Sequence, residues 1–180
     1  MSELLGRKLK HFFTLMDRDR SDTLELNDYL TTADSVSRSF GMATGSAEHN
    51  ELRRAFTRFW EDIIKPMDTD GNGHVSFDEY RTAYNTGILD NAQGYERIRP
   101  IADAIINIAD TESNGKITAD NFTLALSGYG VPEPDCRTAF AALDEDGSGF
   151  LTRNELQEAT EQYFLGTDPE LPGNTLFGRF

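Results

Sequence analysis

The sequence has little of several features, and each shortage excludes a class of protein. It contains a single cysteine, Cys136, so no disulfide can form within the chain, which fits a reducing compartment. No apolar run approaches the length that crosses a membrane. The segment MSELLGRKLKHFF lacks the apolar stretch of a signal peptide, and no glycine at position 2 offers a myristoylation site. We therefore expect a soluble, cytoplasmic protein.

Basic residues are also scarce relative to acidic ones. There are 17 Lys and Arg against 31 Asp and Glu, a net charge of −14. Such a chain repels phosphates, so neither nucleic acid nor an anionic membrane is an expected partner. Small hard cations suit it better. Hydrophobic residues make up 38% of the chain and include twelve phenylalanines, enough for a packed core.

A twelve-residue pattern occurs four times. The copies are DRDRSDTLELND at 17–28, DTDGNGHVSFDE at 68–79, DTESNGKITADN at 110–121 and DEDGSGFLTRNE at 144–155. Each begins with Asp, carries oxygen-bearing side chains at positions 3 and 5, and has Leu, Val or Ile at position 8. Apolar residues three and four apart flank every copy and share one face of a helix. The predicted unit is therefore helix, polar loop, helix, four times over.

This repeat resembles the EF-hand, and its spacing is similar to that of the sarcoplasmic calcium-binding protein and bacterial calerythrin family. Successive loops start 51, 42 and 34 residues apart, and the long first interval is typical of the sarcoplasmic type. The resemblance implies an all-α fold with four helix-loop-helix units. It further implies two paired lobes packed into one compact body, with short β-bridges between paired loops. In such bridges Leu24 lies opposite Val75, and Ile117 lies opposite Leu151.

The expected organisation is two EF-hand pairs and a tail. Residues 1–92 hold loops I (17–28) and II (68–79), and residues 93–165 hold loops III (110–121) and IV (144–155), with a connector at 85–94. Gly166 is expected to end the last helix.

The tail, 166–180, carries four large apolar residues: Leu171, Leu176, Phe177 and Phe180. It is either a disordered terminus or a segment that packs on the inner face of the C-terminal pair. The expected receiver on that face is Ile105, Ile106, Phe122, Leu126 and Phe140.

Calcium takes six to eight oxygen ligands at about 2.3–2.6 Å, and a twelve-residue loop can supply them. Side chains at positions 1, 3, 5, 9 and 12 and the carbonyl at 7 are the donors, and a glycine makes the turn at 6. In loop II these are Asp68, Asp70, Asn72, the His74 carbonyl, Ser76 through water and Glu79, with Gly73 at the turn. In loop IV they are Asp144, Asp146, Ser148, the Phe150 carbonyl, Thr152 and Glu155, with Gly149 at the turn.

The other two loops depart from the pattern. Loop I offers Asp17, Asp19, Ser21, the Thr23 carbonyl, Glu25 and Asp28. Asp28 is one methylene shorter than the usual Glu, which favours six-fold coordination and hence Mg²⁺ as well as Ca²⁺. Asp22 replaces the turn glycine. Loop III has Asn121 at position 12 and Glu112 at position 3, so it either binds metal weakly or serves as a metal-free structural partner of loop IV.

No constellation of catalytic residues accompanies the loops, so we expect no enzyme. Sensors of the EF-hand class expose a Met-rich groove, whereas this chain has only four methionines, one of them at position 1. The low number of methionines favours a buffer over a sensor. The expectation is a monomeric, cytoplasmic Ca²⁺/Mg²⁺ buffer with two strong sites, one further site and one weak or empty site. The alternative is a calcium sensor that regulates a protein target, whose identity the sequence does not predict.

Overall fold

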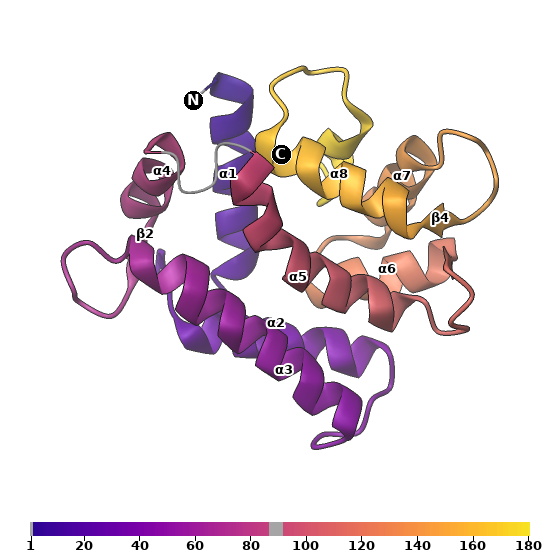
Figure 1. Cartoon of the computed structure of the whole chain (residues 1–180), viewed down its shortest axis with the longest axis horizontal. Helices are drawn as coiled ribbons and strands as arrows, with labels where there is room; N and C mark the ends of the chain where they lie inside the picture. The colour runs from indigo at the N-terminus through magenta and orange to yellow at the C-terminus, as the bar shows by residue number, and fades with distance from the viewer. Residues whose placement is uncertain (1, 87–91) are drawn as a thin grey trace.

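The structure, a computed structural model, describes residues 2–86 and 92–180 (Figure 1). The described residues form helices joined by loops, with four two-residue strands. The α-helices are α1 (Glu3–Met16), α2 (Leu26–Ser39), α3 (Ala47–Phe59), α4 (Phe77–Asn85), α5 (Ala92–Ala109), α6 (Ala119–Gly128), α7 (Glu133–Leu143) and α8 (Arg153–Leu165). The strands are β1 (Thr23–Leu24), β2 (Val75–Ser76), β3 (Lys116–Ile117) and β4 (Leu151–Thr152). The all-α prediction is confirmed.

The residues that end loops II and IV also start the helices that follow. Ser76 Oγ accepts a hydrogen bond from the Glu79 N–H, while the Glu79 side chain accepts one from the Ser76 N–H. Thr152 and Glu155 form the same capping box at α8. Two otherwise unpaired N–H groups are thereby satisfied at each helix start. The last loop position is consequently fixed by the helix it opens.

The loops pair through antiparallel bridges, as predicted. Strand β1 pairs with β2, placing Leu24 opposite Val75, and β3 pairs with β4, placing Ile117 opposite Leu151. All four side chains are buried at the base of their loops. Each bridge therefore holds two loops side by side on one apolar layer.

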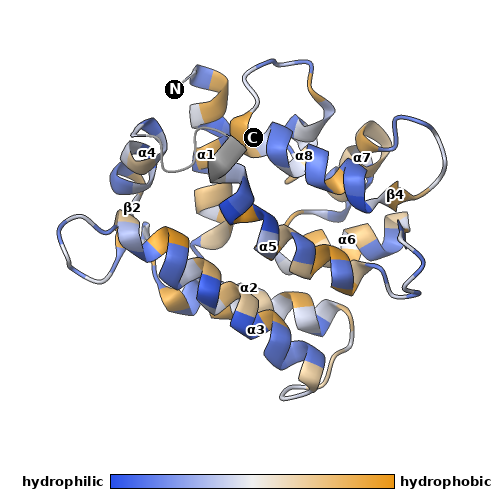
Figure 2. Cartoon of the chain, viewed as in Figure 1, coloured by the Kyte–Doolittle hydropathy of each residue, from blue (hydrophilic) through white to orange (hydrophobic). Residues whose placement is uncertain are grey.

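The two pairs pack into one body through α2 and α6. A Cβ atom on Gly128 would lie only 2.4 Å from Val36 Cγ2, so the two helices approach as closely as a glycine allows. Nearby, Ser39 Oγ donates a 2.7 Å hydrogen bond to the Leu124 carbonyl. Figure 2 shows hydrophobic and hydrophilic bands alternating along α3 and α5, as expected of amphipathic helices. The apolar sides form one continuous core.

The helix leading into loop II is irregular. After α3 the chain continues as a π-helical turn, η1 (Trp60–Ile64), and a 3₁₀ turn, η2 (Lys65–Met67). Pro66 lacks the N–H that a regular helix needs, which explains the change of winding just before Asp68. The sequence spacing indicated an ordinary helix here. The apolar positions Ile63 and Met67 are nevertheless buried.

The tail is ordered and packs on the body, which confirms the second of the two expectations for it. Gly166 ends α8, and the chain then returns alongside α8 through a 3₁₀ turn, η3 (Pro172–Thr175) (Figure 1). Leu176 and Phe177 are 4% and 8% exposed. The Phe177 ring lies 4.9 Å from the rings of Phe12 and Tyr163.

The surface on which the tail packs includes more elements than the sequence predicted. Besides α7 and α8, helix α1 contributes to it, because the Lys8 ammonium donates to the carbonyls of Gln162 and Gly166 and to Asn174 Oδ1 at 2.8–2.9 Å. Burial lowers the pKa of Lys8 to about 8, so the amine is still protonated at neutral pH and can donate all three bonds. His11 Nε2 also lies 2.9 Å from the Phe177 carbonyl.

Part of the predicted connector, residues 87–91, lies outside the described residues. The boundary between residues 92 and 93 stays a prediction. Within the described ranges, no helix is long and apolar enough to cross a bilayer.

Candidate metal centres

The first aspartate of each loop organises the loop in the same way. Its two carboxylate oxygens accept hydrogen bonds from the backbone N–H groups at positions 5 and 6. In loop IV, for example, Asp144 accepts from Ser148 at 2.9 Å and from Gly149 at 3.0 Å. The same pairs occur at Asp17, Asp68 and Asp110. In all four loops the backbone thus folds around the carboxylate of the position-1 aspartate, which is the first expected ligand.

In three loops the carboxylates converge. One oxygen from each member of a trio lies within 4.8 Å of the others. The trios are Asp17, Asp19 and Asp28; Asp68, Asp70 and Glu79; and Asp144, Asp146 and Glu155. Like charges this close repel unless a cation lies between them, and carboxylate oxygens are the donors that hard divalent cations prefer. The donor set of each trio therefore fits calcium or magnesium.

Glu79 is held at the end of loop II by four donors. Its Oε1 accepts from the N–H and hydroxyl of Thr69, and its Oε2 accepts from the N–H and hydroxyl of Ser76, at 2.8–3.0 Å. These bonds favour the anion and lower the pKa of Glu79 to about 2, the Ser76 N–H contributing most. The carboxylate is ionised and oriented across the loop.

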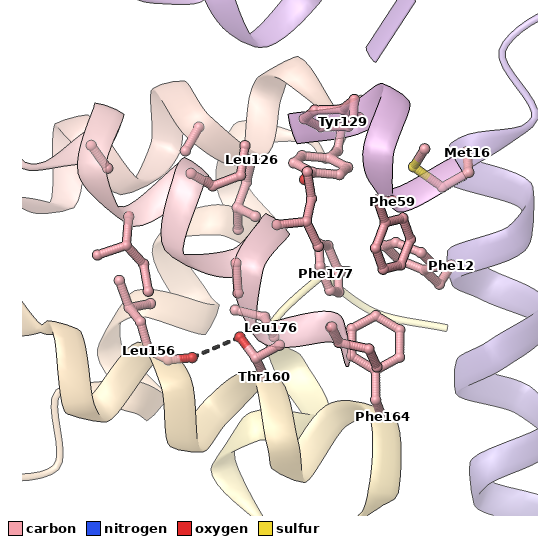
Figure 3. A pocket seen from close by; sticks show the side chains of 18 of the residues that line it. Phe12, Met16, Phe59, Leu126, Tyr129, Leu156, Thr160, Phe164, Leu176 and Phe177 are labelled. Carbon is pink, nitrogen blue, oxygen red and sulfur yellow. Dashed lines mark hydrogen bonds between the residues drawn. The ribbon is translucent and has the colours of Figure 1, made fainter. Parts of the chain in front are cut away.

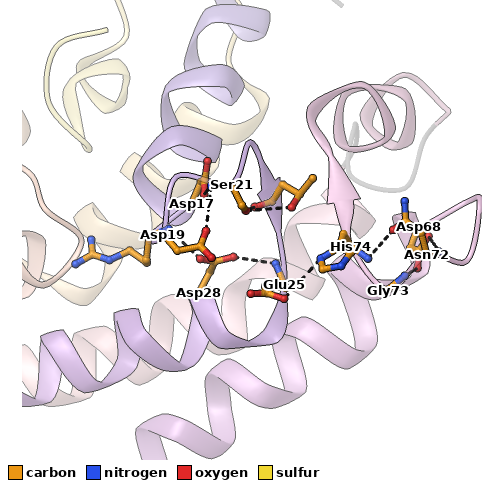
Figure 4. A network of polar contacts seen from close by, with 11 residues as sticks. Asp17, Asp19, Ser21, Glu25, Asp28, Asp68, Asn72, Gly73 and His74 are labelled. Atoms are coloured by element: carbon orange, nitrogen blue, oxygen red, sulfur yellow. Dashed lines mark hydrogen bonds and ion pairs between the residues drawn. The ribbon is translucent and has the colours of Figure 1, made fainter.

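Asp28 occupies the corresponding place in loop I despite its shorter side chain (Figure 4). Its Oδ1 accepts from the Arg18 N–H and its Oδ2 from the Glu25 N–H, each at 2.9 Å. These two donors stand at the same loop positions, 2 and 9, as Thr69 and Ser76 do in loop II. Asp28 is almost fully buried, and burial raises its pKa despite these two bonds. Asp28 thus meets the backbone donors at the same two loop positions as Glu79 does, although its side chain is one methylene shorter.

Loop IV repeats the arrangement of loop II with fewer contacts. Glu155 Oε2 accepts from the N–H and hydroxyl of Thr152 at 2.8 and 2.7 Å. Donors from Ser148 lower the pKa of Asp146, so that carboxylate too is ionised. Ser148 Oγ donates to the Phe150 carbonyl at 2.9 Å, which shows that the position-7 carbonyl points toward the ligand side chains.

Loop III has only two carboxylates at its ligand positions, Asp110 and Glu112. At position 12, Asn121 Nδ2 donates a 2.9 Å hydrogen bond to Thr111 Oγ1, at loop position 2. In loop II the corresponding contact runs the other way, from Thr69 to the Glu79 carboxylate. The amide therefore closes loop III without adding negative charge.

The turn residues have the backbone conformation expected of them. Gly73 and Gly149 have φ of 88° and 82°, a region that favours glycine. Asp22 adopts φ of 63° at the same position in loop I, so loop I makes the turn with a side chain that tolerates it.

Two contacts of the metal loops were missed by the sequence reasoning. Arg18, in loop I, donates through its guanidinium to the Tyr129 carbonyl at 2.9 Å, linking this loop to the turn between α6 and α7. His74, in loop II, places Nδ1 3.6 Å from Glu25 Oε2 in loop I (Figure 4). Neither residue carries a sequence signal for these roles, because each contact depends on the packing of distant segments.

Comparison with known proteins agrees with this geometry. Family models described as an EF-hand domain pair match residues 7–85 and residues 113–163. The two matches together include most of the chain; the first contains loops I and II, and the second begins within loop III and contains loop IV. The chain belongs to the EF-hand family, and Ca²⁺ is its expected ion.

Comparison with individual proteins shows which kind of EF-hand protein this chain resembles. The chain is 27% identical to calerythrin of Saccharopolyspora erythraea over 169 residues, which is 92% of this chain and 96% of calerythrin. A calcium-binding protein of Streptomyces coelicolor, described in connection with calcium-mediated regulation, has a structure with a TM-score of 0.78 at 29% identity, covering 91% of this chain and 99% of that one. An amphioxus sarcoplasmic calcium-binding protein shares the fold, with a TM-score of 0.74 at 15% identity and coverage of 100% and 99%. The predicted likeness to the sarcoplasmic and calerythrin type is confirmed.

Proposed function

We propose that this protein binds three calcium ions, at loops I, II and IV, while loop III is a metal-free structural partner of loop IV. The convergence of three carboxylates within 4.8 Å in each of the three loops carries the proposal. The proposed ligands are the oxygen donors named above for these loops, including the carbonyls of Thr23, His74 and Phe150. Loop III, with two carboxylates at its ligand positions and an amide at position 12, lacks the charge that strong calcium binding requires.

Titration calorimetry on position-12 variants tests the assignment of loops II and IV. Glu79→Gln and Glu155→Gln each remove one ligand charge and keep the side-chain size, so each variant is expected to lose one strong binding event. Glu158→Gln is the matched control, because Glu158 is exposed on α8 outside the loops and undergoes the same charge change. Unchanged stoichiometry and affinity in both loop variants would show that these residues are not ligands.

Loop I is expected to be the most magnesium-tolerant of the three sites. Asp28 brings a shorter carboxylate, which favours the six-fold coordination of Mg²⁺. Asp28→Glu should therefore raise the ratio of calcium to magnesium affinity at loop I severalfold. The reciprocal variant Glu79→Asp should lower that ratio at loop II. Competition titrations with both ions measure the two ratios, and equal ratios before and after the swaps would refute the geometric argument.

We propose a buffer as the use of these sites, in a monomeric, cytoplasmic, non-enzymatic protein. The tail supports this reading, because Leu176 and Phe177 already cover apolar surface in the core that a sensor would offer to a target. A buffer takes up calcium without opening, whereas a sensor exposes a groove. Binding of an environment-sensitive dye at saturating calcium and excess magnesium distinguishes them: a buffer shows no calcium-dependent rise.

A regulatory role is the second candidate. The Streptomyces coelicolor protein, 29% identical, is described in connection with calcium-mediated regulation. If this chain acts similarly, calcium must expose an apolar face. The same dye experiment would then show a rise on calcium addition, and the tail is the element that would have to move.

A further inference from the structure

A cavity lies in the core where both EF-hand pairs and the tail meet (Figure 3). Its volume is about 90 Å³, and its walls come from α1, α2, α3, α5, α6, α8 and the tail. A single water needs only about 10–15 Å³ of such volume, so the space is far larger than a packing defect. Well-packed cores contain few voids of this size.

The lining decides what the cavity can hold. Phenylalanine, isoleucine, leucine and alanine side chains make most of it, and no charged side chain is among the described residues that line it. Thr160, one of its few polar members, donates its hydroxyl to the Leu156 carbonyl at 2.7 Å (Figure 3). A buried water needs two to four polar partners, and besides Thr160 this lining offers only the hydroxyls of Tyr29 and Tyr129. The cavity therefore suits an apolar molecule better than water.

One polar group in the wall is left without a partner. Tyr29 lines the cavity, is 1% exposed, and its hydroxyl makes no hydrogen bond within the part of the chain that the structure describes. An unpaired buried hydroxyl is costly, so a ligand that supplies a hydrogen bond would be favoured over one that does not.

A route from solvent also exists. Phe59 and Ile101 line both the cavity and an open hollow on the outer surface between α3 and α5. Both side chains are only half-buried. Rotation of these two side chains would connect the cavity to the surface without unfolding a helix.

We propose that this cavity binds a small, uncharged aromatic molecule carrying one hydroxyl group, with the size and chemistry of phenol. An engineered apolar cavity of about 150 Å³ in another protein holds benzene, so a single six-membered ring fits this smaller space when half-buried wall residues such as Phe59 and Ile101 move aside. Ring faces such as those of Phe12, Tyr129 and Phe177 provide the edge and face contacts that a bound aromatic ring prefers. The Tyr29 hydroxyl pairs with the ligand hydroxyl.

Methyl and aromatic NMR of the full calcium-loaded chain tests the proposal, with phenol and toluene as probes. Phenol is expected to cause saturable shifts at cavity residues such as Ile105, Leu126 and Leu176, and toluene to bind more weakly. Tyr29→Phe should weaken phenol binding by about twofold to tenfold and leave toluene binding unchanged. Tyr84→Phe is the matched control, because Tyr84 also has a buried, unpaired hydroxyl but does not line the cavity.

Filling the cavity provides the second test. Ala125→Leu places a larger side chain in the wall and is expected to abolish the shifts for both probes. If Ala125→Leu folds poorly, Leu126→Phe on the same helix replaces it, because this variant fills the cavity with an aromatic ring and should also abolish the shifts. The proposal is overturned if phenol gives no saturable shift, if Tyr29→Phe binds phenol as tightly as Tyr84→Phe, or if the shifts persist in a folded, filled variant.

Discussion

Chelating calcium will lower the melting temperature of this protein by about 20 °C. Each occupied site adds about 2.7 kcal/mol when free calcium is a hundredfold above its dissociation constant, so three sites add about 8 kcal/mol. That is a large part of the total stability of a typical domain, about 5–15 kcal/mol. For a chain of this size, each kcal/mol shifts the melting temperature by about 2–4 °C.

The arrangement of charge supports a large effect. In each of the three trios, three carboxylates approach within 4.8 Å, in a chain whose net charge is −14. Three calcium ions would offset six of those negative charges. Without them, the mutual repulsion of the carboxylates acts directly on helix ends, because Asp28, Glu79 and Glu155 lie in the first turns of α2, α4 and α8. Losing the ion therefore weakens the loops and the helices together.

Scanning calorimetry with calcium and with a chelator measures the difference at constant ionic strength. The doubly substituted protein Glu79→Gln, Glu155→Gln is the internal control, since it should melt between the two wild-type forms in calcium. Melting temperatures within a few degrees of each other for the calcium and chelated wild type would contradict the expectation.

The parts of the fold that the sequence predicted well are those that depend on short segments. A loop of twelve residues specifies its own turn, so Gly73 and Asp22 have the positive φ expected of them. The bridge registers followed as well, because Leu24 and Val75 are the position-8 residues of adjacent loops. The ligand carboxylates of a loop converge because its first aspartate accepts hydrogen bonds from the backbone N–H groups at positions 5 and 6 and so holds the backbone in a turn. Interactions within each twelve-residue loop thus determine most of the geometry of the candidate metal sites.

The parts that the sequence did not predict depend on contacts between distant segments. The close approach of α2 and α6 needs the absence of a side chain at Gly128, which looks like any helical glycine in the sequence. The contact of Arg18 with the Tyr129 carbonyl joins residues 111 positions apart. The π-helical turn after α3 was not predicted either, because the apolar spacing before loop II is that of an ordinary helix. The cavity likewise exists only where many helices meet.

Removing the tail after Gly166 is expected to lower the melting temperature of the calcium form by about 10 °C. Burying Leu176 and Phe177 stabilises the fold by roughly 1.5–3 kcal/mol each, and the entropy of ordering the segment offsets part of this. Truncation also takes the Asn174 oxygen from the buried Lys8 ammonium. A net loss of about 3 kcal/mol corresponds to the stated shift.

A shorter truncation separates burial from simple shortening. Removing only residues 179 and 180 keeps Leu176 and Phe177 in place, and deletes the exposed contact between Arg179 and Asp135 together with the half-buried Phe180 ring beside Tyr163. Surface ion pairs contribute about 0–1 kcal/mol and a half-buried ring contributes less than two buried side chains, so this control should melt closer to the intact protein than the truncation after Gly166 does. Equal melting temperatures for the intact chain and the truncation after Gly166 would show that the tail does not contribute to stability.

Truncation after Gly166 also tests whether the protein is a calcium buffer or a calcium sensor. Phe177 packs between α1 and α8, against Phe12 and Tyr163, and lines the central cavity with Leu176. Once the tail is gone, this apolar surface is open, and dye binding in calcium should rise above that of the intact protein. A buffer with a permanently seated tail shows the rise only after truncation. If the intact protein already shows the full calcium-dependent rise, the tail leaves the body when calcium binds, and the sensor reading replaces the buffer.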